Sequence, residues 1–219
     1  MTRAPYPPIA WNRRECEASH PTHDSIWGGN HVNVSIKSGD IDGDGQPDSV
    51  HLAEDPDAGP NCRTFVVVDT GDVTYSANLT VESLLGYHSG GSTLAQIVDL
   101  GGSSGDEIVV KQVATATEWM HFYPVYTLHA GKLQAVDGPA NAYDPYGLRT
   151  GAGCSTDGRI VMSTASDLDP NVARTVTRRF YELVATTWHR VGRDTGEVPA
   201  GQPLAAAYPE FARPFFGGC

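Results

Sequence analysis

The residues with the clearest chemistry lie between Asp40 and Asp48, where the sequence reads D-I-D-G-D-G-Q-P-D. Carboxylates occupy positions 1, 3, 5 and 9 of this segment, and Gly45 occupies position 6. Oxygen ligands in this pattern converge on a hard cation such as Ca²⁺, and the glycine permits the sharp turn that brings them together. A backbone carbonyl at position 7, here that of Gln46, usually completes the shell. The segment predicts a calcium loop; the alternative is a polar Asp/Gly turn.

The flanks of this loop predict strands rather than helices. HVNVSIK, before the loop, alternates between apolar and polar residues, and SVHLAE, after it, is short and strand-like. Position 12, where a helix–loop–helix site needs a bidentate acid, is His51. The loop resembles those of FG-GAP/VCBS repeats, which occur in integrin-α-like β-propellers and in secreted actinobacterial proteins. The resemblance implies structural Ca²⁺ held by four carboxylates and one carbonyl, those of Asp40, Asp42, Asp44, Asp48 and Gln46.

A second segment repeats this pattern in degenerate form. VDLGGSSGDEIVV can be laid on the first loop without a gap, with Asp99 on Asp40 and Glu107 on Asp48, a shift of 99 − 40 = 59 residues. Gly101 and Ser103 replace the two central carboxylates, so we expect weak or no calcium binding there. A shorter third version, CSTDGRIVM, has a tight Asp-Gly turn in place of the loop. A period of this length indicates repeated supersecondary units.

The pattern of strand-forming residues predicts an all-β fold of about three four-stranded antiparallel units, arranged as in a propeller or as a compact set of three sheets. A repeat domain over 29–192 would contain units at about 29–82, 92–138 and 147–192, between irregular segments at 1–28 and 193–219. The expected strands are roughly 31–38, 48–53, 63–69 and 72–80, then 93–99, 106–114, 120–129 and 132–136, then 149–154, 159–165, 173–184 and 187–192. We expect the irregular segments, which carry aromatic residues, to wrap the sheets.

Composition excludes several classes of protein. Lys and Arg total 15 and Asp and Glu total 26, a formal net charge of −11, which disfavours binding to nucleic acid or to anionic lipid. No apolar run approaches the roughly 20 residues that span a bilayer. The 24 glycines and 15 prolines favour many short elements joined by turns.

The four cysteines are widely spaced and form no CxxC pair, which suits two disulfides in an exported protein. We expect Cys16–Cys62 and Cys154–Cys219, although three pairings are possible, and four unrelated thiols in a cytosolic protein are the alternative. No hydrophobic stretch follows the first positive charge, so the chain reads as a mature segment of a secreted or cell-envelope protein, or as a cytosolic protein.

No set of residues in the sequence forms a recognisable catalytic group. The nearest candidates are His20, His23, Asp24 and His31, which could bind zinc, although their spacing matches no established motif. The preferred hypothesis is a calcium-stabilised β-repeat domain that binds a protein or glycan and catalyses nothing, as a monomer or weak homo-oligomer. The alternative is a metal-dependent extracellular hydrolase that uses His20, His23 and His31.

Overall fold

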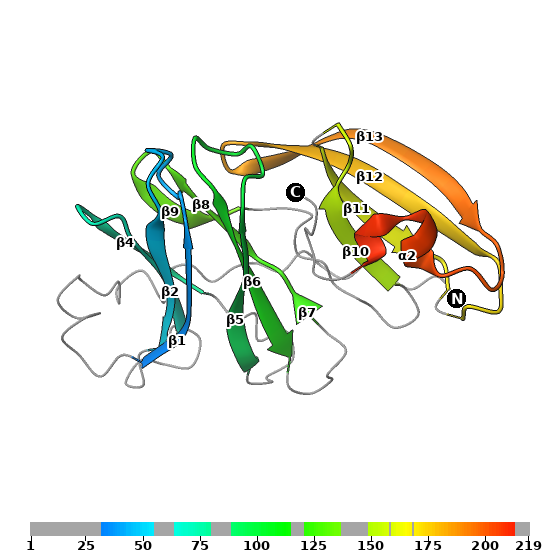
Figure 1. The fold of residues 1–219 in the computed structure, drawn as a ribbon, viewed down its shortest axis with the longest axis horizontal. Helices are drawn as coiled ribbons and strands as arrows, with labels where there is room; N and C mark the ends of the chain where they lie inside the picture. The colour runs from blue at the N-terminus through cyan, green and yellow to red at the C-terminus, as the bar shows by residue number, and fades with distance from the viewer. Residues whose placement is uncertain are drawn as a thin grey trace, which may run out of the picture.

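The computed structural model describes residues 32–54, 64–79, 89–114, 121–136, 149–157, 159–167 and 169–212. The described strands form three antiparallel sheets that follow one another along the chain (Figure 1). The all-β fold with three repeated units is therefore confirmed. Among the described residues, no helix has the length and the apolar character that crossing a membrane requires.

The first sheet has the order β1-β2-β3-β4. Its strands are β1 (Val32–Gly39), β2 (Asp48–Glu54), β3 (Thr64–Asp69) and β4 (Thr74–Asn78), close to the predicted bounds. β3 contains a continuous apolar run, FVVV, in which both alternating sets of side chains are buried. Val66 and Val68 face the second sheet, whereas Phe65 and Val67 form a small cluster with Ala53 on the other face.

The second sheet has the order β5-β6-β8-β9, with β7 pairing beside β8 on β6. Its strands are β5 (Ser89–Val98), β6 (Glu107–Ala114), β7 (His121–Phe122), β8 (Val125–His129) and β9 (Lys132–Ala135). The single strand predicted at 120–129 is wrong, because Pro124 divides it. Proline has no N–H to donate to a ladder; its carbonyl accepts from the Val110 N–H at 3.0 Å, so pairing with β6 resumes beyond it.

The third sheet has the order β10-β11-β12-β13. Its strands are β10 (Arg149–Cys154), β11 (Ile160–Ala165), β12 (Arg174–Val184) and β13 (Thr187–Val198). β13 continues six residues beyond the predicted end at 192, so the segment 193–219 is not irregular from its start. β13 is this long because it pairs with β12 along the whole length of that strand, from Val184 opposite Thr187 to Arg174 opposite Val198.

Neighbouring sheets pack face to face through apolar clusters. One cluster lies between the first and second sheets and includes Ile41, Val50 and Ile108. A second lies between the second and third sheets and includes Leu100, Val109 and Trp188 among its members. The first and third sheets therefore each bury one face against the second sheet, which is packed on both faces, as neighbouring propeller blades are.

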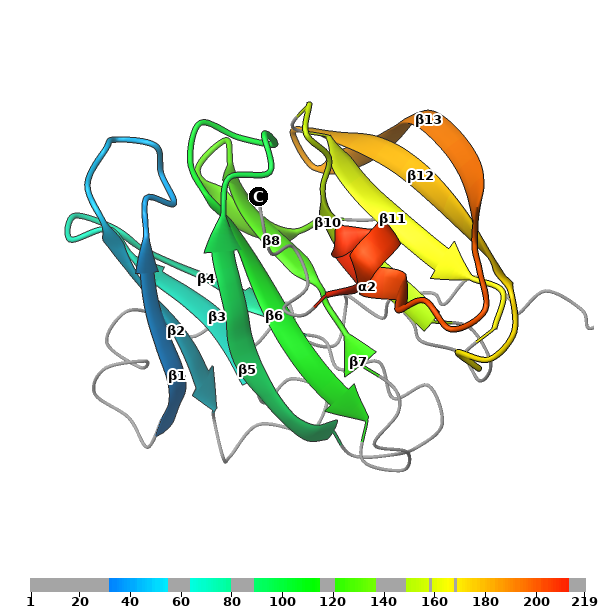
Figure 2. The same ribbon diagram turned by 45° about the vertical axis from the view of Figure 1, so that its right-hand side comes forward.

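The free face of the third sheet is covered by the end of the chain. After β13, the short helix α2 (Leu204–Ala207) and the 3₁₀ helix η4 (Pro209–Phe211) lie against β10 and β11 (Figure 2). Leu204 and Phe211 pack with Val176 and Val198 in a third cluster. The expectation that the C-terminal segment wraps the sheets is confirmed for these residues; the N-terminal segment 1–28 lies outside the described residues.

Two glycines allow the units to approach closely. A Cβ on Gly105 would lie 2.3 Å from the carbonyl oxygen of Ile41 and 2.6 Å from that of Asp40, both in the loop between β1 and β2. A Cβ on Gly102 would lie 2.3 Å from Cδ2 of Leu183, in the third sheet. The backbone of the loop between β5 and β6 therefore lies close to backbone atoms of the first unit and to a side chain of the third unit.

The Gly105→Ala variant should lose about 2 kcal/mol of unfolding free energy, because the new methyl group would overlap backbone atoms that cannot rotate away. Gly192→Ala is the matched control, since its Cβ would lie 3.4 Å from Cδ2 of Phe180, an ordinary contact. The control should stay within about 0.5 kcal/mol of the wild type. Urea unfolding followed by tryptophan fluorescence measures both, and equal stability of the two variants would contradict the close approach.

Candidate metal centre

The acidic loop between β1 and β2 is folded by its own first carboxylate. Asp40 Oδ1 accepts a hydrogen bond from the Gly43 N–H at 2.9 Å, and Oδ2 accepts one from the Gly45 N–H at 3.0 Å. Both glycines have positive φ, 79° and 84°, a conformation that other residues adopt with strain. The predicted role of Gly45 in the turn is therefore confirmed.

The next acids continue the loop in a chain of short turns. Asp42 Oδ1 accepts from the Asp44 N–H at 3.1 Å, and Asp44 Oδ1 accepts from the Gln46 N–H at 2.7 Å. Each side chain thus fixes the backbone two residues ahead, as Asx turns do.

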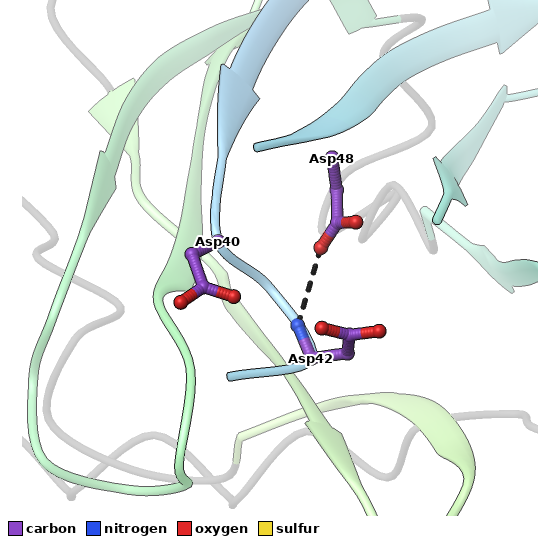
Figure 3. A group of neighbouring side chains, drawn as sticks. All are labelled: Asp40, Asp42 and Asp48. Carbon is purple, nitrogen blue, oxygen red and sulfur yellow. Dashed lines mark hydrogen bonds between the residues drawn. The ribbon is translucent and has the colours of Figure 1, made fainter. Parts of the chain in front are cut away.

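Asp48 closes the loop from the start of β2. Its side chain is only 4% exposed, and Oδ2 accepts from the Ile41 N–H at 2.7 Å. The same oxygen accepts from the Asp42 N–H at 3.2 Å, the bond drawn in Figure 3. Burial raises the pKa of Asp48, the negative charges of Asp42 and Asp44 add to this effect, and the two backbone bonds oppose it.

Three of the predicted ligands gather at one point. Asp40, Asp42 and Asp48 each offer a carboxylate oxygen, and these oxygens lie within 4.8 Å of one another (Figure 3). A single cation can be held by donors at such separations. Asp44 is exposed and lies outside this group, and ligation by the carbonyl of Gln46 stays a prediction.

His51, at position 12 counted from Asp40, belongs to the sheet rather than to the site. It lies in β2, between Ile36 of β1 and Val67 of β3. Burial lowers its pKa, which keeps the ring neutral at physiological pH. The site is thus made by the loop and by the first residue of β2.

The second loop reproduces this frame, as the 59-residue shift predicts. Glu107 Oε2 accepts from the Leu100 N–H at 2.7 Å, the counterpart of the bond from Ile41 to Asp48. Asp99 Oδ1 accepts from the Gly101 N–H at 2.8 Å. The third version, between β10 and β11, is a short turn closed by the Ser155 N–H bonding to the Arg159 carbonyl at 2.8 Å.

Protein donors satisfy the acid of the second loop. Glu107 is fully buried, and its Oε1 accepts from the hydroxyls of Ser103 and Thr127, each at 3.2 Å. Burial raises the pKa of Glu107, while the bonds from Leu100, Ser103 and Thr127 oppose the rise. Glu107 is thus surrounded by hydroxyl groups, whereas Asp48 of the first loop lies beside other carboxylates.

Three hydrogen bonds join the two loops, and the sequence did not indicate them. The Asp106 N–H donates to the Asp40 carbonyl at 2.6 Å, and Asp106 Oδ2 accepts from the Asp40 N–H at 3.1 Å. The Ser104 hydroxyl donates to the Asp42 carbonyl at 3.3 Å. The only signal was that Asp106 stands where the first loop has Pro47, since 106 − 59 = 47.

Other predicted site residues lie outside the described residues. These are His20, His23, Asp24 and His31 of the alternative metal site and the cysteines Cys16, Cys62 and Cys219. Cys154 is the one cysteine that the structure describes, and it is not a free thiol. Both disulfide pairings therefore stay predictions.

Comparison with known proteins identifies neither a family nor a function for this chain. No known family matches the chain, and no curated protein matches it. One solved structure, that of exotype rhamnogalacturonan lyase YesX, is similar at 15% sequence identity and a TM-score of 0.33. The match covers 86% of this chain and 36% of the lyase chain. A TM-score this low carries no argument about fold or function.

The Glu107→Gln variant should flatten the pH dependence of stability. Because burial holds the pKa of Glu107 above its unfolded value, the folded protein binds this proton more tightly than the unfolded chain does. The unfolding free energy therefore falls as pH rises from the ordinary glutamate range through the raised pKa. Glutamine removes this dependence and can still accept the bond from Leu100, so stability at neutral pH should be retained or increased.

Glu107→Ala is the contrasting variant. It leaves the buried Leu100 N–H without its acceptor and should cost about 1–3 kcal/mol at neutral pH. Urea unfolding over a series of pH values measures both effects, and Asp48, which is common to all the proteins, cancels in the comparison. A wild-type pH slope in Glu107→Gln would show that this carboxyl does not titrate as described.

Proposed function

We propose that this chain is a calcium-stabilised β-repeat domain of the FG-GAP/VCBS type, which belongs to a secreted or cell-envelope protein and binds a protein or glycan. The observation that carries the proposal is the convergence of Asp40, Asp42 and Asp48 in a loop of nine residues. Calcium in this role ties β1 to β2 and neutralises the loop.

The donor set supports calcium over a transition metal. The clustered side chains are all carboxylates, with neither histidine nor cysteine among them. Oxygen ligands suit Ca²⁺, whereas zinc and copper sites usually include nitrogen or sulfur. Carboxylates gathered this closely repel one another, and a bound divalent cation converts that repulsion into attraction.

The arrangement of the loops supports a binding role. The loops that follow β1, β5 and β10 all leave their sheets at the same edge of the molecule (Figures 1 and 2). The first two are joined by hydrogen bonds from Asp106 and Ser104, so the calcium loop is part of a continuous surface. Loops fixed on a rigid sheet scaffold are where proteins most often place binding residues.

Calcium should bind at one site per chain and raise the melting temperature. Asp40→Asn should weaken binding at least about tenfold, because it removes one negative charge beside the cation. Its single amide oxygen can replace only one of the two oxygens that accept from Gly43 and Gly45, so one of these loop bonds is lost as well. Asp99→Asn is the matched control, since Asp99 holds the equivalent place in the second loop. Isothermal titration calorimetry gives the affinity, and melting curves in calcium and in chelator give the stabilisation.

The control should bind calcium like the wild type. Either of two results would contradict the proposal: a wild-type melting temperature that is the same in calcium and in chelator, or an equal loss of affinity in Asp40→Asn and Asp99→Asn.

Asp106→Ala should weaken calcium binding about threefold to tenfold without removing any predicted ligand. The Asp40 N–H loses its acceptor, so part of the binding energy must be used to fix the position of Asp40. Ser104→Ala, which removes the longer bond at 3.3 Å from an exposed hydroxyl, should have a smaller effect. The same titration measures both, and an unchanged dissociation constant in Asp106→Ala would limit this residue to holding the sheets together.

A further inference from the structure

The outer hairpin of the third sheet, formed by β12 and β13, contains a β-bulge. Phe180 lies opposite Gly192, but the next residue of β12, Tyr181, lies opposite Arg190, so Val191 is an extra residue in β13. A bulge shifts the alternation of side chains in its strand, and bulges often re-aim a side chain at a functional position.

The bulge brings three arginines to one face. Arg179 lies directly opposite Arg193, and Arg190 lies opposite Tyr181, two residues from Arg179 on β12. Side chains two apart on a strand share a face, so Arg179, Arg190 and Arg193 all point to the same side. In a regular strand, Arg190 and Arg193, which are three residues apart, would point to opposite sides. These three residues are called the arginine face below.

The arginine face has no charge partner in the part of the chain that the structure describes. Among the described residues, none forms an ion pair or a hydrogen bond with any of these three side chains. Like charges directly opposite each other in a sheet are destabilising, so the pair of Arg179 and Arg193 has no structural benefit of its own. Arg190 and Arg193 are exposed, and Arg179 is half-buried.

Arg178, on the opposite face of β12, shows the contrast. It forms an ion pair with Asp194, and its guanidinium lies 5.3 Å from the ring centres of both Phe180 and Tyr208. The pairing with Asp194 raises the pKa of Arg178. This arginine has a structural role, which the arginine face does not share.

We infer that the arginine face binds a carboxylate-bearing glycan; this inference rests on the proposed binding function and names its ligand class. The planar guanidinium matches a carboxylate with two parallel hydrogen bonds. The next pair on the same face is Thr177 and Thr195, which also lie opposite each other. Their hydroxyl groups can donate to and accept from the hydroxyls of a sugar chain.

The placement of the arginines favours a ligand that lies across the strands. β13 is the edge strand of the third sheet, and a peptide that paired with this edge would lie beside Arg190 and Arg193. Arg179 is on β12, one strand further in, so all three are reached only over one face of the sheet. This face also carries Ile160 and Met162, which pack toward the second sheet, whereas Arg190 and Arg193 in the outer strand stay exposed. The net charge of −11 opposes a polyphosphate such as DNA, whose charge density is higher than that of a uronate chain.

The test is calorimetric binding of short oligosaccharides to the full chain, in calcium and in chelator. The anionic probes are oligosaccharides of hyaluronan, alginate and polygalacturonate, and neutral dextran oligosaccharides, a polyglutamate peptide and a short DNA duplex are the comparison ligands. We expect at least one uronate probe to bind, to bind more weakly as salt rises, and to bind more tightly than every comparison ligand.

Variants separate the arginine face from general electrostatics. Arg193→Gln should weaken uronate binding about tenfold, and Arg179→Gln with Arg193→Gln should weaken it further. Lys37→Gln, which removes one exposed positive charge from β1, should leave it unchanged. Arg193→Lys, which keeps the charge but loses the planar fork, should fall between the wild type and Arg193→Gln.

Melting curves without ligand provide the second readout. Arg193→Gln should melt at or above the wild-type temperature at low salt, because it removes a like-charge pair. The inference is overturned if no uronate probe binds, if polyglutamate or DNA binds more tightly, if the double variant binds like the wild type, or if Arg193→Gln is strongly destabilised. Calcium titration of the same protein tests the proposed calcium site separately, so its failure is distinguishable from failure of the arginine face.

Discussion

A buried carboxylate that accepts a backbone N–H from the preceding loop is the interaction on which the rest of the structure depends. It occurs twice, between Asp48 and the Ile41 N–H and between Glu107 and the Leu100 N–H. In each case the donor residue places its side chain in the apolar cluster between two sheets. This hydrogen bond therefore closes the loop at the residue where the second strand begins. It also fixes the position of the donor residue, whose side chain packs against the next sheet. An unmade bond at such a depth would be costly, which explains why both acids stay buried.

Each of the two loops contains a buried acid, and the groups around that acid differ between the loops. Glu107 is one methylene longer than Asp48 and reaches the hydroxyls of Ser103 and Thr127, so protein donors surround it. Asp48 instead shares its surroundings with other carboxylates, whose charges raise its pKa further. Among the described residues, Asp48 accepts only from backbone N–H groups and has no hydroxyl donor, so the proposed cation would balance its charge. The backbone and the side chain of Asp106 both bond to Asp40, so the first loop is tied directly to the second unit.

Local patterns in the sequence predicted the strands and the acidic loop, because both depend on neighbours in the chain. Alternating residues and Asp-Gly spacing indicated β1, β2 and the turn that joins them, and self-similarity indicated the second loop. Interactions over longer distances were missed. Asp106 bonds to a residue 66 positions away, and the extra residue at Val191 shows only when β13 is aligned with β12. The break between β7 and β8 at Pro124 is a local feature that the proline could have indicated. It was missed because the alternating aromatic residues around it favoured one continuous strand.

Charge is distributed unevenly in this acidic chain, and distance determines how that affects a ligand. The net charge of −11 opposes an anion approaching from afar, but charges further apart than about 8 Å are largely screened at physiological salt. On this face of the third sheet, the charges of Arg179 and Arg193 lie opposite each other, and the nearest acid on the same face of β13, Glu197, is four residues further along. The acidic loop lies in the first unit, where its carboxylates are positioned to share a cation instead. A fold of repeated sheets can thus keep the proposed cation site and the proposed anion-binding face in one small domain, because each is built on a different unit.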